Sequence, residues 1–123
     1  MNTALWVAQI ILAGAFGSAG LMKLLRTREQ LHERTPYVED FSDGTIKLIG
    51  TLEVLGAIGL ILPAATGILP WLTPVAAVGV AVLMALAAVV HVRRGETQMI
   101  PVNVVLLLLA LVVAWGRFGP YAL

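Results

Sequence analysis

The sequence predicts an all-α membrane protein: a bundle of four transmembrane helices, with both termini on the outer side and a polar cytoplasmic loop between the first two helices. Composition is the first observation, since 59% of the 123 residues are hydrophobic and only 12% are charged. A soluble domain of this size cannot bury so much apolar surface, because its surface-to-volume ratio is too high. The second is three uncharged stretches, 1–22, 54–90 and 97–116. Each can supply a helix of the ~17–25 residues that cross a bilayer, and the middle stretch supplies most of two.

We predict one domain over residues 1–123, with helices at about 4–25, 46–62, 74–92 and 100–115. No Lys or Arg precedes Ala4, so the basic start of a cleaved signal is missing and we expect the first helix to be retained as a span. A polar stretch with more than half of the charges follows that helix and forms the predicted cytoplasmic loop.

Local signals set the ends of the remaining helices. Ser42 or Asp43 can cap the second helix, because a side-chain oxygen there accepts a hydrogen bond from an unpaired amide. We expect that helix to end before Pro63, since proline disrupts a helix interior. Thr73 followed by Pro74 predicts the start of the third helix, with the threonine hydroxyl as its cap. A tight turn over 93–96 then separates the third helix from the fourth.

Orientation follows from the basic residues, because cytoplasmic loops are enriched in Lys and Arg. The first and third connectors share a side, which carries seven of the eight cations: Lys23, Arg26, Arg28, Arg34, Lys47, Arg93 and Arg94. The opposite end carries the aromatic residues expected at a membrane interface: Trp6, Trp71, Trp115, Phe118 and Tyr121. We therefore predict a multi-pass protein of the cell (inner or plasma) membrane, embedded in the lipid bilayer.

Several classes of function are excluded by composition. The chain has no cysteine, so it has no disulfide, thiolate metal site or cysteine nucleophile. We expect no metal site and no intrinsic cofactor, because only two histidines exist and no glycine-rich nucleotide loop follows a strand. A net charge of +1 without a basic patch argues against nucleic acid as a partner. The sequence leaves open whether the protein forms a homo-oligomer.

Glu53 is the leading candidate for a functional residue. From Leu48 to Val92 only Glu53 and His91 are ionisable. A charge at membrane depth costs roughly 2.5–3.5 kcal/mol on insertion scales unless it finds a partner or water. Lys23 is its natural partner, with His91 second. The sequence therefore predicts either a site or a structural interhelix bond at Glu53.

Four helices bring one polar residue each to the cytoplasmic half: Lys23, Glu53, His91 and Asn103. Such groups can converge on one pocket in a helical bundle. We predict Glu53, His91 and Lys23 as catalytic, and four further residues as ligand-binding: Asn103, Gly50, Gly56 and Met84. The alternatives are that Lys23 snorkels to water, that His91 is only interfacial, and that Asn103 caps or bridges helices.

Small residues predict close helix contacts. On the second helix Gly50, Gly56 and Ala57 share a face with Glu53. On the first helix the small residues on one face are Gly14, Gly17 and Ser18. Such faces let membrane helices approach each other.

Four segments together resemble a known family: 19–24 (AGLMKL), 49–56 (IGTLEVLG), 91–96 (HVRRGE) and 116–120 (GRFGP). In order and spacing they resemble the DoxX-like family of small four-helix bacterial membrane proteins. The resemblance implies a four-helix fold with motif positions at Gly20, Lys23, Gly50, Glu53, Gly56 and His91. It also implies a link to redox systems, because the family name comes from the membrane part of an archaeal thiosulfate:quinone oxidoreductase. Related proteins are linked to oxidative-stress complexes, and a distant eukaryotic branch resembles cargo receptors.

Three functions are compatible with these observations. The first is a redox-associated subunit that binds a quinone or another lipophilic small molecule near Glu53 and receives electrons from a partner protein. The second is a stand-alone membrane enzyme that uses Glu53, with His91 or Lys23, for acid/base isomerisation, cyclisation or epoxide opening. The third is a non-catalytic binding, transport or assembly module.

Overall fold

Four long helices make up the part of the chain that the structure, a computed structural model, describes, residues 2–26 and 41–122. They are α1 (Asn2–Leu25), α3 (Asp43–Thr66), α4 (Leu72–Arg94) and α5 (Ile100–Phe118), and a short 3₁₀ turn η2 (Thr97–Met99) precedes α5. Each is long and apolar enough to cross a membrane. The predicted all-α architecture with four spans is thus confirmed. Most of the predicted polar loop, 27–40, lies outside the described residues.

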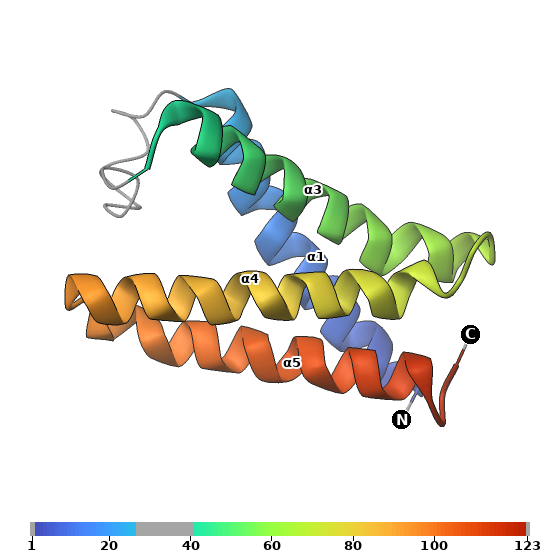
Figure 1. Cartoon of the computed structure of the whole chain (residues 1–123). Coiled ribbons are helices and arrows are strands. Elements are labelled where there is room, and N and C mark those ends of the chain that lie inside the picture. Colours follow the sequence, from blue (N-terminus) through green and yellow to red (C-terminus); the bar gives the residue numbers. More distant parts are fainter. Residues whose placement is uncertain (1, 27–40, 123) are drawn as a thin grey trace.

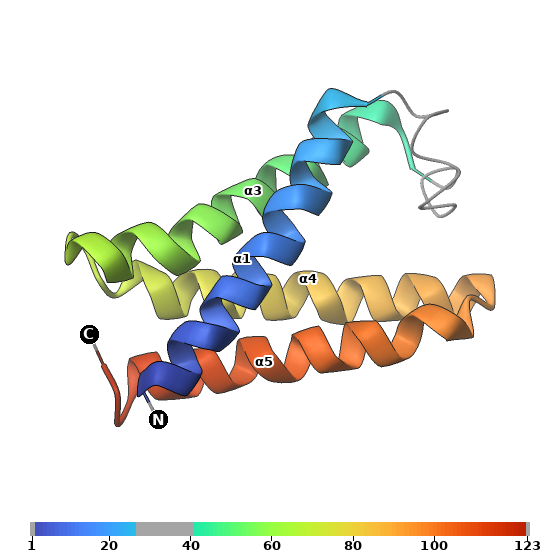
Figure 2. The same cartoon turned by 180° about the vertical axis from the view of Figure 1, so that it is seen from behind.

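The helices run back and forth between two ends (Figures 1 and 2). α4 and α5 lie side by side, and α1 crosses them obliquely. α3 packs against α1 and α4. We call the end with the α1–α3 and α4–α5 junctions the charged end. The opposite, terminal end holds both chain ends and the α3–α4 connector (Figure 1).

The core lies where α1 crosses the other helices. Its largest fully buried apolar side chains include Leu5, Leu12 and Phe16 of α1 and Leu60 of α3. Small residues fill the facing positions, such as Ala77 and Ala110, which are both 0% exposed. Close approach of helices at small residues supplies the packing that holds membrane bundles together. The outward faces carry leucines, isoleucines and valines, as a lipid-facing surface requires.

α3 does not end before Pro63, as the sequence had predicted, but continues to Thr66. A proline at position 63 has no N–H, so it leaves the Gly59 carbonyl without its helical donor. Thr73 supplies the replacement, because its Oγ1 donates to the Gly59 oxygen at 3.0 Å. The predicted role of Thr73 is therefore wrong: α4 begins at Leu72, and the hydroxyl bonds to α3 instead of capping its own helix.

Three helix ends follow ordinary capping chemistry. Ser42 caps α3 as predicted, accepting a hydrogen bond from the Thr45 amide at 3.2 Å. Gly67 and Gly95 end α3 and α4 in the left-handed conformation, which glycine adopts without steric cost. α4 runs two residues beyond each of its predicted ends, and α5 begins at Ile100 as predicted and continues to Phe118, because helix termini are the least specific part of a sequence pattern.

α1 and α3 cross in close contact at two glycines. A Cβ at Gly20 would lie 2.6 Å from the Gly50 carbonyl oxygen, and a Cβ at Gly50 would lie 2.8 Å from the Cβ of Lys23. No larger residue fits at either position without moving a helix. The predicted small face of α1 is correct only at Gly17, which faces Ala57. Positions 14 and 18 are exposed, so that part of the prediction is wrong.

Candidate functional site

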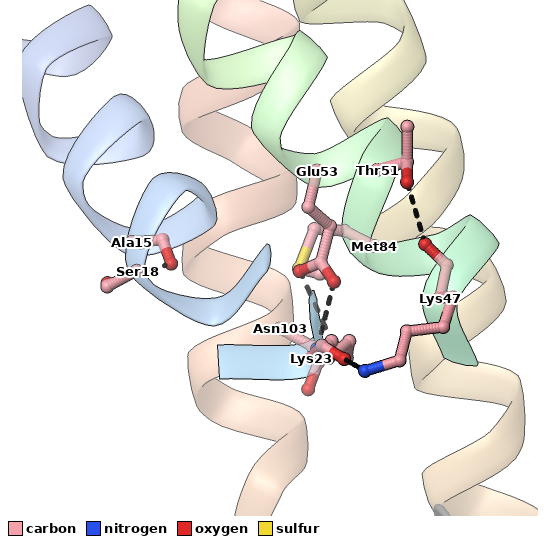
Figure 3. Close-up of polar contacts among 8 residues, drawn as sticks. All are labelled: Ala15, Ser18, Lys23, Lys47, Thr51, Glu53, Met84 and Asn103. Carbon is pink, nitrogen blue, oxygen red and sulfur yellow. Dashed lines mark hydrogen bonds and ion pairs between the residues drawn. The ribbon is translucent and has the colours of Figure 1, made fainter. Parts of the chain in front are cut away.

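A buried ion pair joins α1 to α3 near the charged end. Lys23 Nζ lies 2.9 Å from Glu53 Oε1, and the two side chains are 6% and 7% exposed. Figure 3 shows the Glu53 carboxylate directed toward Lys23. Each charge is thus compensated at a depth where either alone would be costly. Lys23 is the partner that the sequence predicted for Glu53, and its burial excludes the alternative that it snorkels to water.

The ion pair is positioned by contacts of the same two helices. The glycine crossing brings the α1 and α3 backbones together at Lys23 itself. Lys47, one and a half turns before Glu53, donates from Nζ to the carbonyl oxygens of Lys23, Leu24 and Arg26 at 2.8, 2.9 and 3.4 Å. The last carbonyls of a helix have no partner within it, so this ammonium completes the end of α1. The sequence had marked Lys47 only as a cytoplasmic charge.

A cavity of about 420 Å³ adjoins Glu53 between α3 and α4. Its polar and charged lining residues are Glu53, His91 and Arg93, and Met84 is among its apolar ones. The rest of the lining is aromatic or aliphatic: Phe41, Ile49, Leu83, Leu86, Ala87, Val89 and Val90. Sites for small molecules have this size and composition, with a few polar groups that fix the orientation of the ligand. Glu53 therefore both joins two helices and lines a cavity.

His91 is held by a carboxylate from the turn that follows α4. Its Nδ1 lies 3.0 Å from Glu96 Oε1, and Arg94 Nε lies 3.3 Å from the same oxygen. Because a carboxylate only accepts hydrogen bonds, this contact assigns the Nδ1 proton to the His91–Glu96 bond. His91 is 6% exposed, so it is buried against its neighbours, and whether its role goes beyond that of an interfacial residue stays a prediction.

Asn103 reaches the cavity through Met84. Its Nδ2 donates to Met84 Sδ at 3.6 Å, and Asn103 itself is 5% exposed (Figure 3). This is an interhelix contact between α5 and α4, one of the alternatives that the sequence had left open. The methionine, in turn, lines the same cavity as Glu53 and His91.

The predicted site residues thus fall into three groups. Glu53, His91 and Met84 line the cavity, while Lys23 and Asn103 each contact one of these side chains. The two predicted ligand-binding glycines lie at helix contacts: Gly50 at the α1–α3 crossing, and Gly56 where a Cβ would meet Val80 Cγ2 at 3.0 Å. The catalytic and ligand-binding roles of all seven stay predictions.

Sequence reasoning missed Glu96 as part of the site. It lies outside the apolar segments, and only its spacing of five residues from His91, across a glycine, hints that the chain turns back there. The turn does so, because the Glu96 amide donates to the His91 carbonyl at 2.8 Å.

A second buried polar cluster, at the terminal end, was also missed. Arg117 is 3% exposed and donates from Nε to Gln9 Oε1 at 2.8 Å and from Nη1 to Asn2 Oδ1 at 2.6 Å. Gln9 also donates from Nε2 to the Leu60 carbonyl at 2.7 Å, so it connects α1, α3 and α5. The available signal was a glutamine in the middle of an apolar helix, since such a group must find a partner in the bundle.

The fold and the site together define a small integral membrane bundle with a buried ion pair beside an apolar cavity. The sequence then gives its family: the model of the DoxX-like family matches residues 7–113, and the chain belongs to that family. The match reaches into all four helices and confirms the resemblance inferred from the motifs. Neither curated proteins nor solved structures gave a match.

Proposed function

We propose that the protein binds a quinone, or another lipophilic molecule with a similar weakly polar head, in the cavity beside Glu53, as the membrane subunit of a redox system. The observation that carries the proposal is the cavity lining. An acid from α3 and an imidazole from α4 lie in walls that are otherwise mainly apolar. Such walls hold the body of a lipophile, and the two polar side chains can bind its head.

The two side chains suit the chemistry of a quinone head. The carbonyl oxygens of the quinone can accept a hydrogen bond from the His91 ring, and the hydroxyls of the quinol can donate to the Glu53 carboxylate. Reduction of the quinone to the quinol takes up two electrons and two protons. Glu53 and His91 are side chains of the types that transfer protons. In this proposal Lys23 holds the Glu53 carboxyl in place at 2.9 Å, Glu96 fixes the His91 ring, and a partner protein supplies the electrons.

Equilibrium binding of a short-chain benzoquinone to the detergent-purified protein tests the proposal. A hydrogen bond to a charged group contributes about 1.5–3 kcal/mol, and the hydroxyls of the reduced form, the quinol, can donate to the Glu53 carboxylate. Glu53→Gln should therefore weaken binding of the short-chain quinol, measured in parallel, roughly tenfold or more. His91→Gln should weaken binding of the benzoquinone, and this second variant leaves the Lys23–Glu53 pair intact. Thr51→Val is the matched control, because its hydroxyl is exposed and bonds within α3 to the Lys47 carbonyl at 2.8 Å. Equal affinity in all four proteins would overturn the proposal.

The His91–Glu96 contact also favours a second candidate, the acid/base enzyme. A carboxylate that orients an imidazole at 3.0 Å is a common way to prepare a general base. Here the isolated protein, without an electron donor, should convert a lipophile to a product of equal mass, or of one added water if an epoxide opens. Liquid chromatography with mass spectrometry would detect either change. Glu96→Gln should slow it, and no conversion by the purified protein would remove this candidate.

The distribution of charge supports an orientation with the charged end in the cytoplasm and both termini outside. The cysteine-free sequence makes the orientation easy to test. Single cysteines at Gln98, at the charged end, and at Ile68, in the α3–α4 connector, are both exposed. In intact cells a membrane-impermeant maleimide should label the Ile68→Cys protein and not the Gln98→Cys protein. The opposite pattern would reverse the orientation.

A further inference from the structure

We infer that the ligand of the Glu53 cavity carries one long hydrocarbon chain, and that this chain lies in a second, apolar groove between α3 and α4. The inference rests on the proposed function, because a head bound beside Glu53 and His91 fixes where the chain begins. It goes further by naming the class of ligand: a single-chain lipophile with a small, uncharged polar head.

The groove has a volume of about 910 Å³ and runs toward the α3–α4 connector. Leu83 and Leu86 line both the groove and the cavity, so the two spaces adjoin along the same pair of helices. All residues that line the groove are uncharged, and nearly all are apolar. A molecule whose head occupies the cavity therefore has apolar walls for its chain next to it, along the same two helices.

Small residues give this groove its depth. At its floor the helices nearly touch, since a Cβ at Gly59 would lie 2.8 Å from the Ala76 Cβ. Gly79 leaves open space, because a Cβ there would have nothing within 4 Å. Larger side chains on either side, such as Leu62 of α3 and Val82 of α4, are both 53% exposed and form the walls. The result is a furrow along two helices, open on its outer side.

The length of the groove sets the length of the chain. On α4 its lining runs from Leu72 to Leu86. At about 1.5 Å per residue, this run is on the order of 20 Å long. That distance is about two thirds of the ~30 Å hydrocarbon core of a bilayer. A prenyl or acyl chain of similar length would fill it.

The depth of Glu53 argues for a weakly polar head and against a phospholipid. Glu53 lies ten residues from the start of α3, on the order of 15 Å along the helix axis. Arg93, the cation of the cavity lining, is exposed in the last turn of α4. A phosphodiester brought past it to the depth of Glu53 would meet a carboxylate and carry the cost of a charge in the apolar core. An uncharged ring with hydrogen-bonding oxygens would carry no such cost.

Photolabelling tests the inference on the whole protein in lipid nanodiscs. The probe is a benzoquinone with a prenyl chain of about the groove's length that carries a diazirine at its far end. Light should attach it to residues at the connector end of the groove, such as Leu62 and Val75, identified by mass spectrometry of peptides. An excess of the short-chain benzoquinone should abolish the labelling, because it displaces the head that holds the chain there.

Two glycine variants give a matched comparison. Gly79→Phe places a side chain in the open space of the groove and should reduce the labelling at least fivefold. Gly14→Phe is the control, because Gly14 also has nothing within 4 Å of a Cβ but lies exposed on α1, away from the groove. It should label like the unchanged protein. Both variants should still bind the short-chain benzoquinone.

The outcomes separate the two levels of the proposal. If the short-chain benzoquinone binds but the diazirine labels lipid-facing residues of α1 and α5 as strongly as the groove, the chain lies in bulk lipid and the inference is overturned. Undiminished labelling in Gly79→Phe would also overturn it. If the short-chain benzoquinone neither binds nor competes, the proposed function itself fails.

Discussion

Replacing Lys23 with methionine isolates the contribution of the buried ion pair, because the side chain stays unbranched, becomes only one atom shorter and loses its charge. Glu53 is 5% exposed, so Lys23→Met leaves its carboxylate buried without the ammonium at 2.9 Å. Removing one partner of a buried pair costs about 3–5 kcal/mol. That is a factor of roughly 10²–10⁴ in the unfolding equilibrium.

Removal of both charges should cost far less. Replacing a buried ion pair by apolar residues of similar volume is often neutral or stabilising. We therefore expect Lys23→Met combined with Glu53→Leu to unfold within about 1 kcal/mol of the unchanged protein. Unfolding in mixed micelles with increasing sodium dodecyl sulfate, followed by the fluorescence of the three tryptophans, measures all the variants. Arg26→Met, an exposed cation at the end of α1, is the control and should change stability by no more than about 0.5 kcal/mol.

Two results would refute this reasoning. If the unfolding free energy of Lys23→Met alone lies within about 1 kcal/mol of that of the unchanged protein, then Glu53 has water or another partner, because a buried unpaired carboxylate would destabilise the protein by more than that. If the double variant is as unstable as the single one, the cost comes from lost packing of the lysine stem and not from the charge.

Three further predictions concern helix contacts, each measured by the same unfolding assay. Gly50→Ala should destabilise the protein by about 1–3 kcal/mol, because the added methyl group overpacks the α1–α3 crossing. Gly79→Ala has open space around it and should be neutral or slightly stabilising, so equal effects of the two variants would contradict the crossing geometry. Thr73→Val should lower the free energy of unfolding by about 1–3 kcal/mol, because it leaves the Gly59 carbonyl unpaired. In a Pro63→Ala background, which restores the helical N–H donor, the loss should be much smaller; an equal loss in both backgrounds would show that the Thr73 hydroxyl does not replace that donor. Gln9→Leu removes hydrogen bonds that connect three helices and should cost about 1–3 kcal/mol; a neutral result would mean that the Arg117 cluster is solvated.

The features that the sequence predicted correctly depend on residue type alone. Long apolar stretches must form spanning helices, because a bilayer leaves backbone groups no other way to satisfy their hydrogen bonds. A carboxylate in such a stretch must find a partner, and Lys23 was the cation at a matching depth on another helix. The Glu53–Lys23 pair could therefore be predicted without coordinates.

The features that sequence reasoning missed depend on contacts between helices. Pro63 predicted a helix end, but a hydroxyl from α4 supplies the hydrogen bond that the proline removes. Glu96 lies in a turn whose course brings it back to His91, which no periodicity reveals. Gln9 was overlooked because a single neutral polar residue hardly changes the hydropathy of α1, although its two hydrogen bonds cross the bundle.

The most direct test of a ligand site at Glu53 is an experimental structure of the protein in nanodiscs with a prenylated benzoquinone. We expect density for the ring between Glu53 and His91, within hydrogen-bond distance of at least one of them, and density for the chain along the α3–α4 groove. A cavity closed by side chains, or filled by lipid chains with no head group beside Glu53, would contradict this and leave the carboxylate as a structural bond between α1 and α3.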